Sequence, residues 1–286
     1  MIQLQNEYLT AKFNEIGAEL KSLMMDGREY IWPGHPEIWK SSCPVLFPVC
    51  GGMKDNKYTY KGKEYPMTRH GFVRTRPFTV ESLSDTRVVF LNKSDAETKA
   101  MYPFDYELRL VYTLQEKSVQ IEYFVKNLTE DTMYFSIGSH EGYLTPGGVE
   151  DYDVIFPQKE TLNTYVLSGT ILSNETMPIL KEQAVLPIYE KYFMIDTLVF
   201  KDLQSKSATL RNRKTGRAIR VDFPDAENFM IWHNPGAPYL CLEPWNGVAD
   251  IVGSSYAIEE KEGIRTLAAG ETYHNTHTIT IVDAGE

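Results

Sequence analysis

Residues 105–125 read DYELRLVYTLQEKSVQIEYFV, and this stretch decides the fold class. In its first half, residues 105–115, apolar and polar side chains alternate, which is typical of a half-buried strand. After the polar break at residues 115–118, the alternation resumes and continues to Val125. Because two alternating runs joined by a short polar segment form a hairpin, the stretch predicts two antiparallel strands.

Similar β-rich runs, separated by turn sequences such as Asp26-Gly27, lie on both sides of this hairpin. Only residues 96–101 and 180–184 suit a turn or two of helix, and neither sustains a helical pattern. We therefore predict an all-β chain, a large sandwich or barrel with few short helices, that forms one domain over residues 1–286. The other predicted strands are residues 8–13, 78–83, 87–92, 132–137, 198–202, 207–211, 218–223 and 276–282.

The chain has 286 residues and an excess of acidic side chains. Its 29 Lys and Arg residues against 39 Asp and Glu residues give a formal net charge of −10. Phosphate binding depends on clustered cations, and no such cluster dominates this sequence, so we expect no nucleic-acid partner. A small neutral ligand suits this charge better.

The amino terminus lacks the basic and apolar segments of a secretory signal, and no stretch reaches the roughly 18 apolar residues of a membrane span. The cysteines Cys43, Cys50 and Cys241 are odd in number and widely spaced, which is typical of reduced thiols rather than a disulfide framework. We therefore expect a cytoplasmic protein with no membrane partner.

Four segments set ionisable side chains among apolar or glycine neighbours, where desolvation alters their chemistry. Each candidate also has a structural explanation. A histidine beside glycine, as at His70 and His140, often stabilises a turn. Asp196 suits a turn before its strand, and Arg74 suits a solvated charge. The segments are RHGFVR (69–74), SIGSHEGY (136–143), YFMIDTLVF (192–200) and PYLCLEPWNG (238–247).

Glu243 is the strongest single candidate, because a carboxylate at the end of an apolar strand is costly to bury without a partner. Glu141 is either a second carboxylate of the same site or a surface residue. Trp232 and Trp245 suit the core, or a wall that packs on the apolar face of a sugar ring. We expect structural or exposed positions for His233, His274 and His277.

A series of motifs runs in order through nearly the whole chain. They are Asn6-Glu7-Tyr8, residues 17–23 (GAELKSL), 44–48 (PVLFP), 70–74 (HGFVR), 102–104 (YPF), 138–140 (GSH) and 241–245 (CLEPW). Each motif is weak alone, but their order and spacing on one all-β chain are specific. With them the chain resembles the aldose 1-epimerase (galactose mutarotase) superfamily, particularly its LacX-like branch.

The resemblance implies a galactose mutarotase-like fold, a large antiparallel β-sandwich with a sugar-binding cleft, and no cofactor or metal. By motif matching, His140 takes the role of general acid and Glu243 that of general base. Such a pair opens and closes the hemiacetal ring by proton transfer near neutral pH. We expect apolar walls to raise the pKa of Glu243, and nearby carboxylates to raise that of His140.

The same matching implies a set of substrate contacts. His70 contacts the sugar near its ring or C1 oxygen, Arg74 binds hydroxyls nearby, and Asp196 binds hydroxyls elsewhere on the ring. We add Trp245 as a stacking or wall residue.

The chain departs from the family pattern in two places. Many relatives carry an arginine in the glycine-rich segment after the 44–48 motif, where this chain has CGGMK at residues 50–54. One substrate contact is therefore missing or supplied by Lys54. Glu141-Gly142 follows His140, where proline is usual. These loops set sugar identity, so the preferred hexose stays open.

The predicted function is the interconversion of α and β anomers of an aldohexose, by a monomer or homodimer. One alternative is a hexose-6-phosphate mutarotase, which needs a cationic patch for the phosphate. Another is a non-catalytic carbohydrate-binding or sensing protein. A metal-dependent β-barrel enzyme is disfavoured, because no His-x-His or facial-triad spacing occurs. The cations in the right stretch for a phosphate are Arg69, Arg74, Arg76, Lys54 and Lys57.

Overall fold

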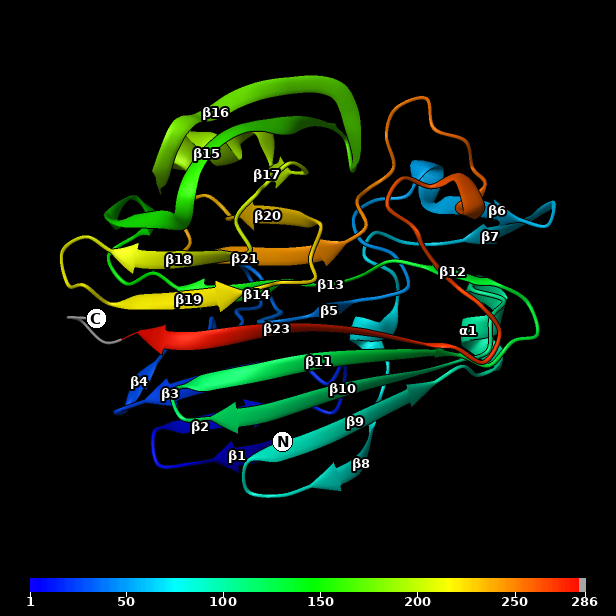
Figure 1. The fold of residues 1–286 in the computed structure, drawn as a ribbon, viewed down its shortest axis with the longest axis horizontal. Helices are drawn as coiled ribbons and strands as arrows, with labels where there is room; N and C mark the ends of the chain where they lie inside the picture. The colour runs from blue at the N-terminus through cyan, green and yellow to red at the C-terminus, as the bar shows by residue number, and fades with distance from the viewer. Residues whose placement is uncertain (283–286) are drawn as a thin grey trace.

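Two large antiparallel sheets dominate the computed structural model, which describes residues 1–282 (Figure 1). The larger sheet has nine strands, and the smaller has six with β14 attached to β21. The nine run in the order β16 (Ile171–Pro187), β15 (Tyr152–Ser168), β18 (Ser207–Asn212), β19 (Ala218–Asp222), β23 (Thr272–Val282), β11 (Ser118–Asn127), β10 (Tyr106–Gln115), β9 (Arg87–Lys93) and β8 (Thr79–Leu83). The smaller sheet consists of β17 (Thr197–Phe200), β20 (Asn228–Trp232), β21 (Tyr239–Asn246), β13 (Ile137–Ser139), β5 (Val45–Leu46) and β14 (Glu141–Leu144).

Smaller sheets and short helical turns complete the described chain. A four-stranded sheet forms from β1 (Ile2–Gln5), β2 (Leu9–Phe13), β3 (Leu20–Met25) and β4 (Arg28–Glu29). Two-stranded pairs form from β6 (Lys57–Tyr60) with β7 (Lys63–Pro66), and from β12 (Met133–Phe135) with β22 (Arg265–Leu267). The helical pieces are α1 (Ala96–Met101), η1 (Lys54–Asn56), η2 (Val73–Thr75), η3 (Val149–Asp151), η4 (Glu190–Ile195) and η5 (Ile258–Glu260).

The hairpin expected at residues 105–125 is confirmed as β10 and β11. Their register runs from Tyr106 opposite Asn127 to Gln115 opposite Ser118, and buried positions alternate along both strands. Most of the buried side chains belong to the main core, which also receives Val45 and Leu242 from the smaller sheet. The prediction of an all-β antiparallel sandwich with few short helices is confirmed.

One helix prediction is right and one is wrong. Residues 96–101 form α1, which begins at a capping box between Asp95 and Thr98. Residues 180–184 lie inside the long strand β16, where Leu180 is paired with Leu162 of β15. Pairing between distant segments overrides the local preference there. Among the described residues, no helix has the length and apolar character needed to cross a membrane.

The smaller sheet separates the core from the region that holds most candidate side chains. Because side chains alternate along a strand, Leu240 and Leu242 of β21 face the main core. Cys241, Glu243 and Trp245 therefore share the opposite face. The arch of β15 and β16 rises above this sheet in Figure 1.

Candidate functional site

His140 and Glu243 are neighbours across two strands of the smaller sheet. On one side of His140, Gly138 is opposite Trp245, and on the other, Glu141 is opposite Leu242. The register is the same on both sides, so its extension sets His140 directly opposite Glu243. Cross-strand partners share a face of the sheet. Residues about one hundred positions apart in sequence are thereby brought together by strand pairing alone.

The two side chains meet within a buried space. His140 Nδ1 lies 3.4 Å from Glu243 Oε1, and the residues are 8% and 1% exposed. The strand continues past Glu243 to Asn246, so the expectation that Glu243 ends its strand is wrong. The main chain on both sides of this carboxyl group is held in the ladder, which fixes its direction.

Aromatic rings surround the imidazole of His140. The ring centroid of His140 lies 5.1 Å from that of Trp39, 5.4 Å from Trp232 and 5.6 Å from His70. Trp39 lies in the segment before β5, in an isolated bridge with His35, and Trp232 ends β20. These rings exclude water from the imidazole.

The electrostatics of the pair follow from this burial. Burial lowers the pKa of His140 to about 3, and the charge of Arg69 acts in the same direction. Burial also raises the pKa of the Glu243 carboxyl well above its usual range. The expected rise for Glu243 is confirmed, whereas the expected rise for His140 is wrong. Desolvation and a neighbouring guanidinium outweigh the carboxylates at this imidazole.

His70 is held beside the pair by an unusual backbone. Its φ of 69° is in the left-handed region, which non-glycine residues rarely adopt. Gly71 follows, and a Cβ there would lie 2.2 Å from the carbonyl oxygen of Phe47. This close approach to β5 therefore requires glycine, and it aims the His70 ring at His140 and at Trp245, whose centroid is 5.4 Å away.

Both ring nitrogens of His70 face hydrogen-bond donors. The backbone N–H of Gly51 lies 3.2 Å from Nδ1, and the Nε–H of Arg69 lies 3.1 Å from Nε2. Burial lowers the pKa of His70, so the ring is neutral and accepts at only one nitrogen. The backbone donor is fixed, which assigns the lone pair to Nδ1 and the proton to Nε2. The Nε–H of Arg69 then faces an N–H group rather than a lone pair, so Arg69 is the partner that moves when a ligand offers an acceptor.

Arg69 also reaches the candidate Asp196. Arg69 Nη1 lies 3.6 Å from Asp196 Oδ2, and both side chains are about one-third exposed, at 35% and 36%. Asp196 has φ 82° and ψ −87°, near the strained γ-turn conformation. Arg74 Nη2 donates to the carbonyl of Arg69 at 3.1 Å, while its Nε is buried with no hydrogen-bond partner. The structure thus groups Arg69, Arg74 and Asp196 at one rim.

Trp245 and Glu141 lie on opposite faces of the same sheet. Trp245 donates from Nε1 to the carbonyl of Ser139 at 2.9 Å, on the face of Glu243. Glu141 is 2% exposed and hydrogen-bonded to Ser139 and His277 on the core side, so its interpretation as a surface residue is wrong.

The other three histidines lie at structural or exposed positions. His277 is buried in its pair with Glu141. His233 is buried against Glu190 and Tyr239, and His274 is exposed, as expected.

A narrow cavity lies beside Trp245 and Arg69, and neither His140 nor Glu243 lines it. Its volume of about 20 Å³ has room for about one water molecule. Small-molecule sites usually measure roughly 300 Å³ or more, so this cavity alone is too small for a sugar. The residues that line the cavity include Gly51, Arg69, Thr170, Thr197, Met230 and Trp245.

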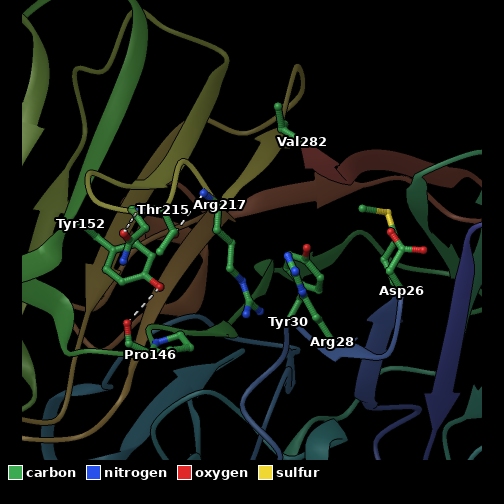
Figure 2. A pocket seen from close by; sticks show the side chains of 10 residues that line it. Asp26, Arg28, Tyr30, Pro146, Tyr152, Thr215, Arg217 and Val282 are labelled. Atoms are coloured by element: carbon green, nitrogen blue, oxygen red, sulfur yellow. Dashed lines mark hydrogen bonds between the residues drawn. The ribbon is translucent and has the colours of Figure 1, made fainter. Parts of the chain in front are cut away.

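A wider hollow of about 420 Å³ lies elsewhere and has a different lining (Figure 2). Arg217 stacks on the ring of Tyr30, 4.0 Å from its centroid, and donates to the carbonyl of Glu29. Its guanidinium is therefore already engaged. None of the candidate side chains from the four sequence segments lines this hollow.

Most cations considered for a phosphate are engaged away from His140. Arg76 pairs with Asp95 and Glu97, and Lys57 pairs with Glu64. Lys54 donates to the carbonyl of Ser254 and lies over the ring of Tyr256, so the structure gives no support to Lys54 as the missing substrate contact. Arg69 and Arg74 alone of the five are grouped with the histidines.

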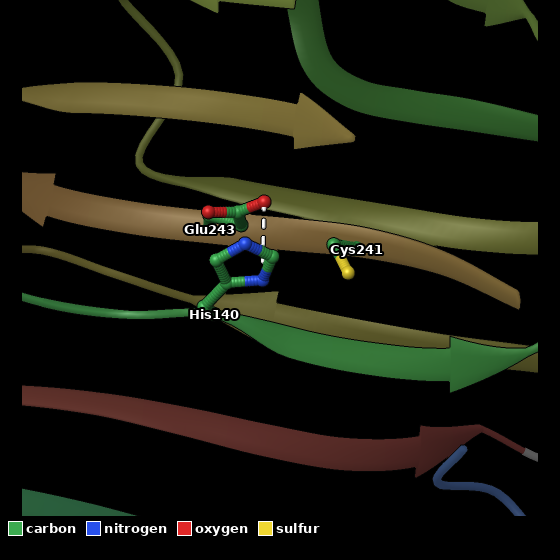
Figure 3. A group of neighbouring side chains, drawn as sticks. All are labelled: His140, Cys241 and Glu243. Carbon is green, nitrogen blue, oxygen red and sulfur yellow. Dashed lines mark ion pairs between the residues drawn. The ribbon is translucent and has the colours of Figure 1, made fainter. Parts of the chain in front are cut away.

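Sequence reasoning missed two neighbours of the pair. Trp39 has no strand or motif around it, although it belongs to a segment with two tryptophans and two prolines, residues 32–39. Cys241 was taken as an ordinary buried thiol. Its place two residues before Glu243 on one strand was the available signal, because that spacing puts both side chains on one face. His140, Cys241 and Glu243 bring their ligand atoms within 4.8 Å of one another (Figure 3).

Comparison with known proteins gives consistent results along the whole chain. Residues 1–280 match the family model described as aldose 1-epimerase. The plasmid and chromosomal LacX proteins of Lactococcus lactis subsp. lactis are each 35% identical over 297 residues, covering 99% of both chains. A galactose mutarotase related enzyme from Lactobacillus acidophilus superposes with a TM-score of 0.94 at 29% identity, covering 99% of this chain and 97% of that one. A galactose mutarotase-like protein from Lactobacillus casei gives the same TM-score and identity, with 99% and 100% coverage.

Proposed function

The chain belongs to the aldose 1-epimerase family, and on that premise we propose that it interconverts the α and β anomers of a free aldohexose. The observation that carries the proposal is the buried contact between His140 and Glu243. Two groups with shifted pKa values at one point of a water-poor site suit proton transfer.

The reaction needs one proton donor and one proton acceptor. The C1 hydroxyl loses a proton as the ring oxygen gains one, and the C1–O5 bond breaks to give an aldehyde. Rotation about C1–C2 presents the other carbonyl face, and ring closure reverses both transfers. Each of the two proton-transfer groups contributes roughly 10² to 10⁴ in rate.

His140 and Glu243 supply both roles if the pair holds a single proton. When imidazolium gives its proton to the ring oxygen and the carboxylate takes the C1 proton, the pair becomes neutral imidazole and carboxylic acid. Closure returns it to the starting form. The shifts that burial imposes favour neutral imidazole and carboxylic acid, so the ion-pair form that starts the cycle is the minor form in the sugar-free chain.

The rim residues provide the contacts with sugar hydroxyls. The Nε2 of His70, which faces Arg69 Nε in the sugar-free chain, donates to the ring or C1 oxygen when Arg69 moves aside. Arg69 and Asp196 exchange their mutual contact for hydroxyl groups, and Arg74 adds its unpartnered Nε–H. Trp245 forms the wall beside His70.

A second candidate is a hexose 6-phosphate substrate. Arg69 and Arg74 both belong to the rim, and two guanidinium groups are a suitable partner for a phosphate. The engagement of Arg76, Lys57 and Lys54 elsewhere weighs against it.

Polarimetry on freshly dissolved α-anomers tests the proposal. The chain is expected to accelerate the approach to equilibrium for glucose or galactose more than for glucose 6-phosphate. Faster turnover of the phosphate would favour the second candidate. Sugar binding in calorimetry without acceleration for any of the three would leave a carbohydrate-binding protein and refute the enzyme.

A further inference from the structure

Three side chains of different chemistry converge at the base of the site. Cys241 and Glu243 project from alternate positions of β21, and His140 faces them from the junction between β13 and β14 (Figure 3). Their ligand atoms all lie within 4.8 Å of one another. All three residues are buried, so their side chains are already ordered before any ion binds.

The imidazole leaves one ligand atom unused. His140 is 8% exposed, and its Nδ1 is buried with no hydrogen-bond partner. A buried nitrogen without a partner is costly, and a bound cation is one way to satisfy it. The nitrogen lies on the side of Glu243, 3.4 Å from its Oε1.

The donor set selects a class of ion. Thiolate, imidazole and carboxylate are the three ligand types of Zn²⁺, whereas Mg²⁺ and Ca²⁺ prefer oxygen alone. At Zn–ligand distances of about 2.0 to 2.3 Å, tetrahedral ligands lie roughly 3.5 Å apart. The cluster therefore needs to contract by only about 1 Å to bind zinc.

We propose that His140, Cys241 and Glu243 form a binding site for Zn²⁺ and similar soft divalent cations, and that its occupation blocks the acid/base pair. Coordination takes the imidazole lone pair and the carboxylate oxygen, and it releases the thiol proton to solvent. Three protein ligands leave a fourth position open on the sugar side. Zinc and sugar then compete for one place.

Cobalt substitution tests the site without reference to turnover. Titration of the reduced, full-length chain with Co²⁺ is expected to give a sulfur-to-cobalt charge-transfer band and the strong visible bands of a four-coordinate ion. Zn²⁺ is expected to abolish both. Cys241→Ser should remove the sulfur band and weaken zinc binding about tenfold or more. Cys43→Ser, which removes a buried thiol outside the cluster, should keep the band.

The possible results distinguish failure of the metal site from failure of the proposed enzymatic function. Absence of the sulfur band, or the same band in Cys241→Ser, would overturn the metal site. His140→Asn gives a second route to the same conclusion if Cys241→Ser does not fold, because it should also weaken zinc binding. If the wild-type chain catalyses anomer exchange, zinc should slow it and excess sugar should restore it. A cobalt signal without any anomer exchange would retain the metal site and refute the enzyme alone.

Discussion

Glu243 is a carboxyl group that the fold buries against its preference for water. Its raised pKa means that the folded state binds a proton more tightly than the unfolded state. The stabilisation from this proton is complete below the unfolded pKa of about 4.5 and is lost as pH rises toward the folded value. Burial of this carboxyl therefore lowers the stability of the fold at neutral pH.

Glu243→Gln is therefore expected to raise the melting temperature. Gln keeps the shape and removes the charge, so the gain over wild type should grow with pH above about 4.5, by about 1.4 kcal/mol for each pH unit up to the folded pKa. Differential scanning calorimetry between pH 5 and 8 measures it. Glu141→Gln is the matched control, because it cuts hydrogen bonds to Ser139 and His277 and should lower the melting temperature. A lower melting temperature for Glu243→Gln at pH 8 would contradict the account.

The proposed function places Arg69 in sugar binding rather than in the chemical step. Arg69→Ala removes a charged donor at the rim, and a hydrogen bond to a charged group contributes roughly 1.5 to 3 kcal/mol. We expect KM to rise about 10- to 100-fold with a smaller change in kcat. Arg220→Ala, on the exposed pair with Asp222, is the control. A large fall in kcat at constant KM would show that Arg69 takes part in proton transfer.

At the scale of elements, the tip of the β15–β16 hairpin packs against loops beside the site. Leu172 exchanges backbone hydrogen bonds with Asp250 and Val252, and Leu167, Thr170 and Leu172 line the narrow cavity. The hairpin thus forms one wall of this cavity.

Gly52→Ala tests this contact. A Cβ at Gly52 would lie 2.2 Å from the carbonyl oxygen of Thr170, so the tip must move away. We expect a loss of about 1 to 3 kcal/mol in stability and faster hydrogen exchange in residues 165–172. Gly62→Ala, where no atom lies within 4 Å of the added Cβ, should leave the exchange of the tip unchanged. Unchanged exchange in Gly52→Ala would show that the tip is not packed there.

At the scale of the whole molecule, buried neutral histidines make the fold sensitive to acid. The pKa of His70 is lowered by burial and, to a lesser extent, by the nearby guanidinium groups of Arg69 and Arg74. Its contribution to stability is present above the unfolded pKa of about 6.5 and is lost as pH falls below it. His70→Gln should therefore reduce the fall in unfolding free energy below pH 6.5 by about 1.4 kcal/mol for each pH unit. Urea unfolding at several pH values measures this slope, and an unchanged slope would contradict it.

Some strands of the fold are predictable from the sequence and others are not. The alternation in residues 105–125 was enough to predict β10 and β11, because one face meets the core and the other meets water. The long strands β15 and β16 carry several register shifts, and their pattern is too irregular for the same reasoning. Their form depends on pairing with each other and with β18.

The candidate site was also only partly predictable from the sequence. The motifs around His70, His140, Asp196 and Glu243 were visible locally, but their meeting depends on strand register and on the loop of Gly71. The direction of the His140 pKa could not be predicted, because Trp39 and Arg69 approach it only in the folded chain.

The central claim is that His140 and Glu243 transfer the protons of ring opening and closure. Exchange NMR on an equilibrated hexose measures the rate between anomers directly. We expect His140→Asn and Glu243→Gln each to lower the protein-catalysed rate by about 10² to 10⁴, and the double variant to lose little more. Glu141→Gln and His277→Asn, a buried pair on the core face of the same sheet, should retain exchange. Folded His140→Asn or Glu243→Gln protein with wild-type exchange would contradict the account.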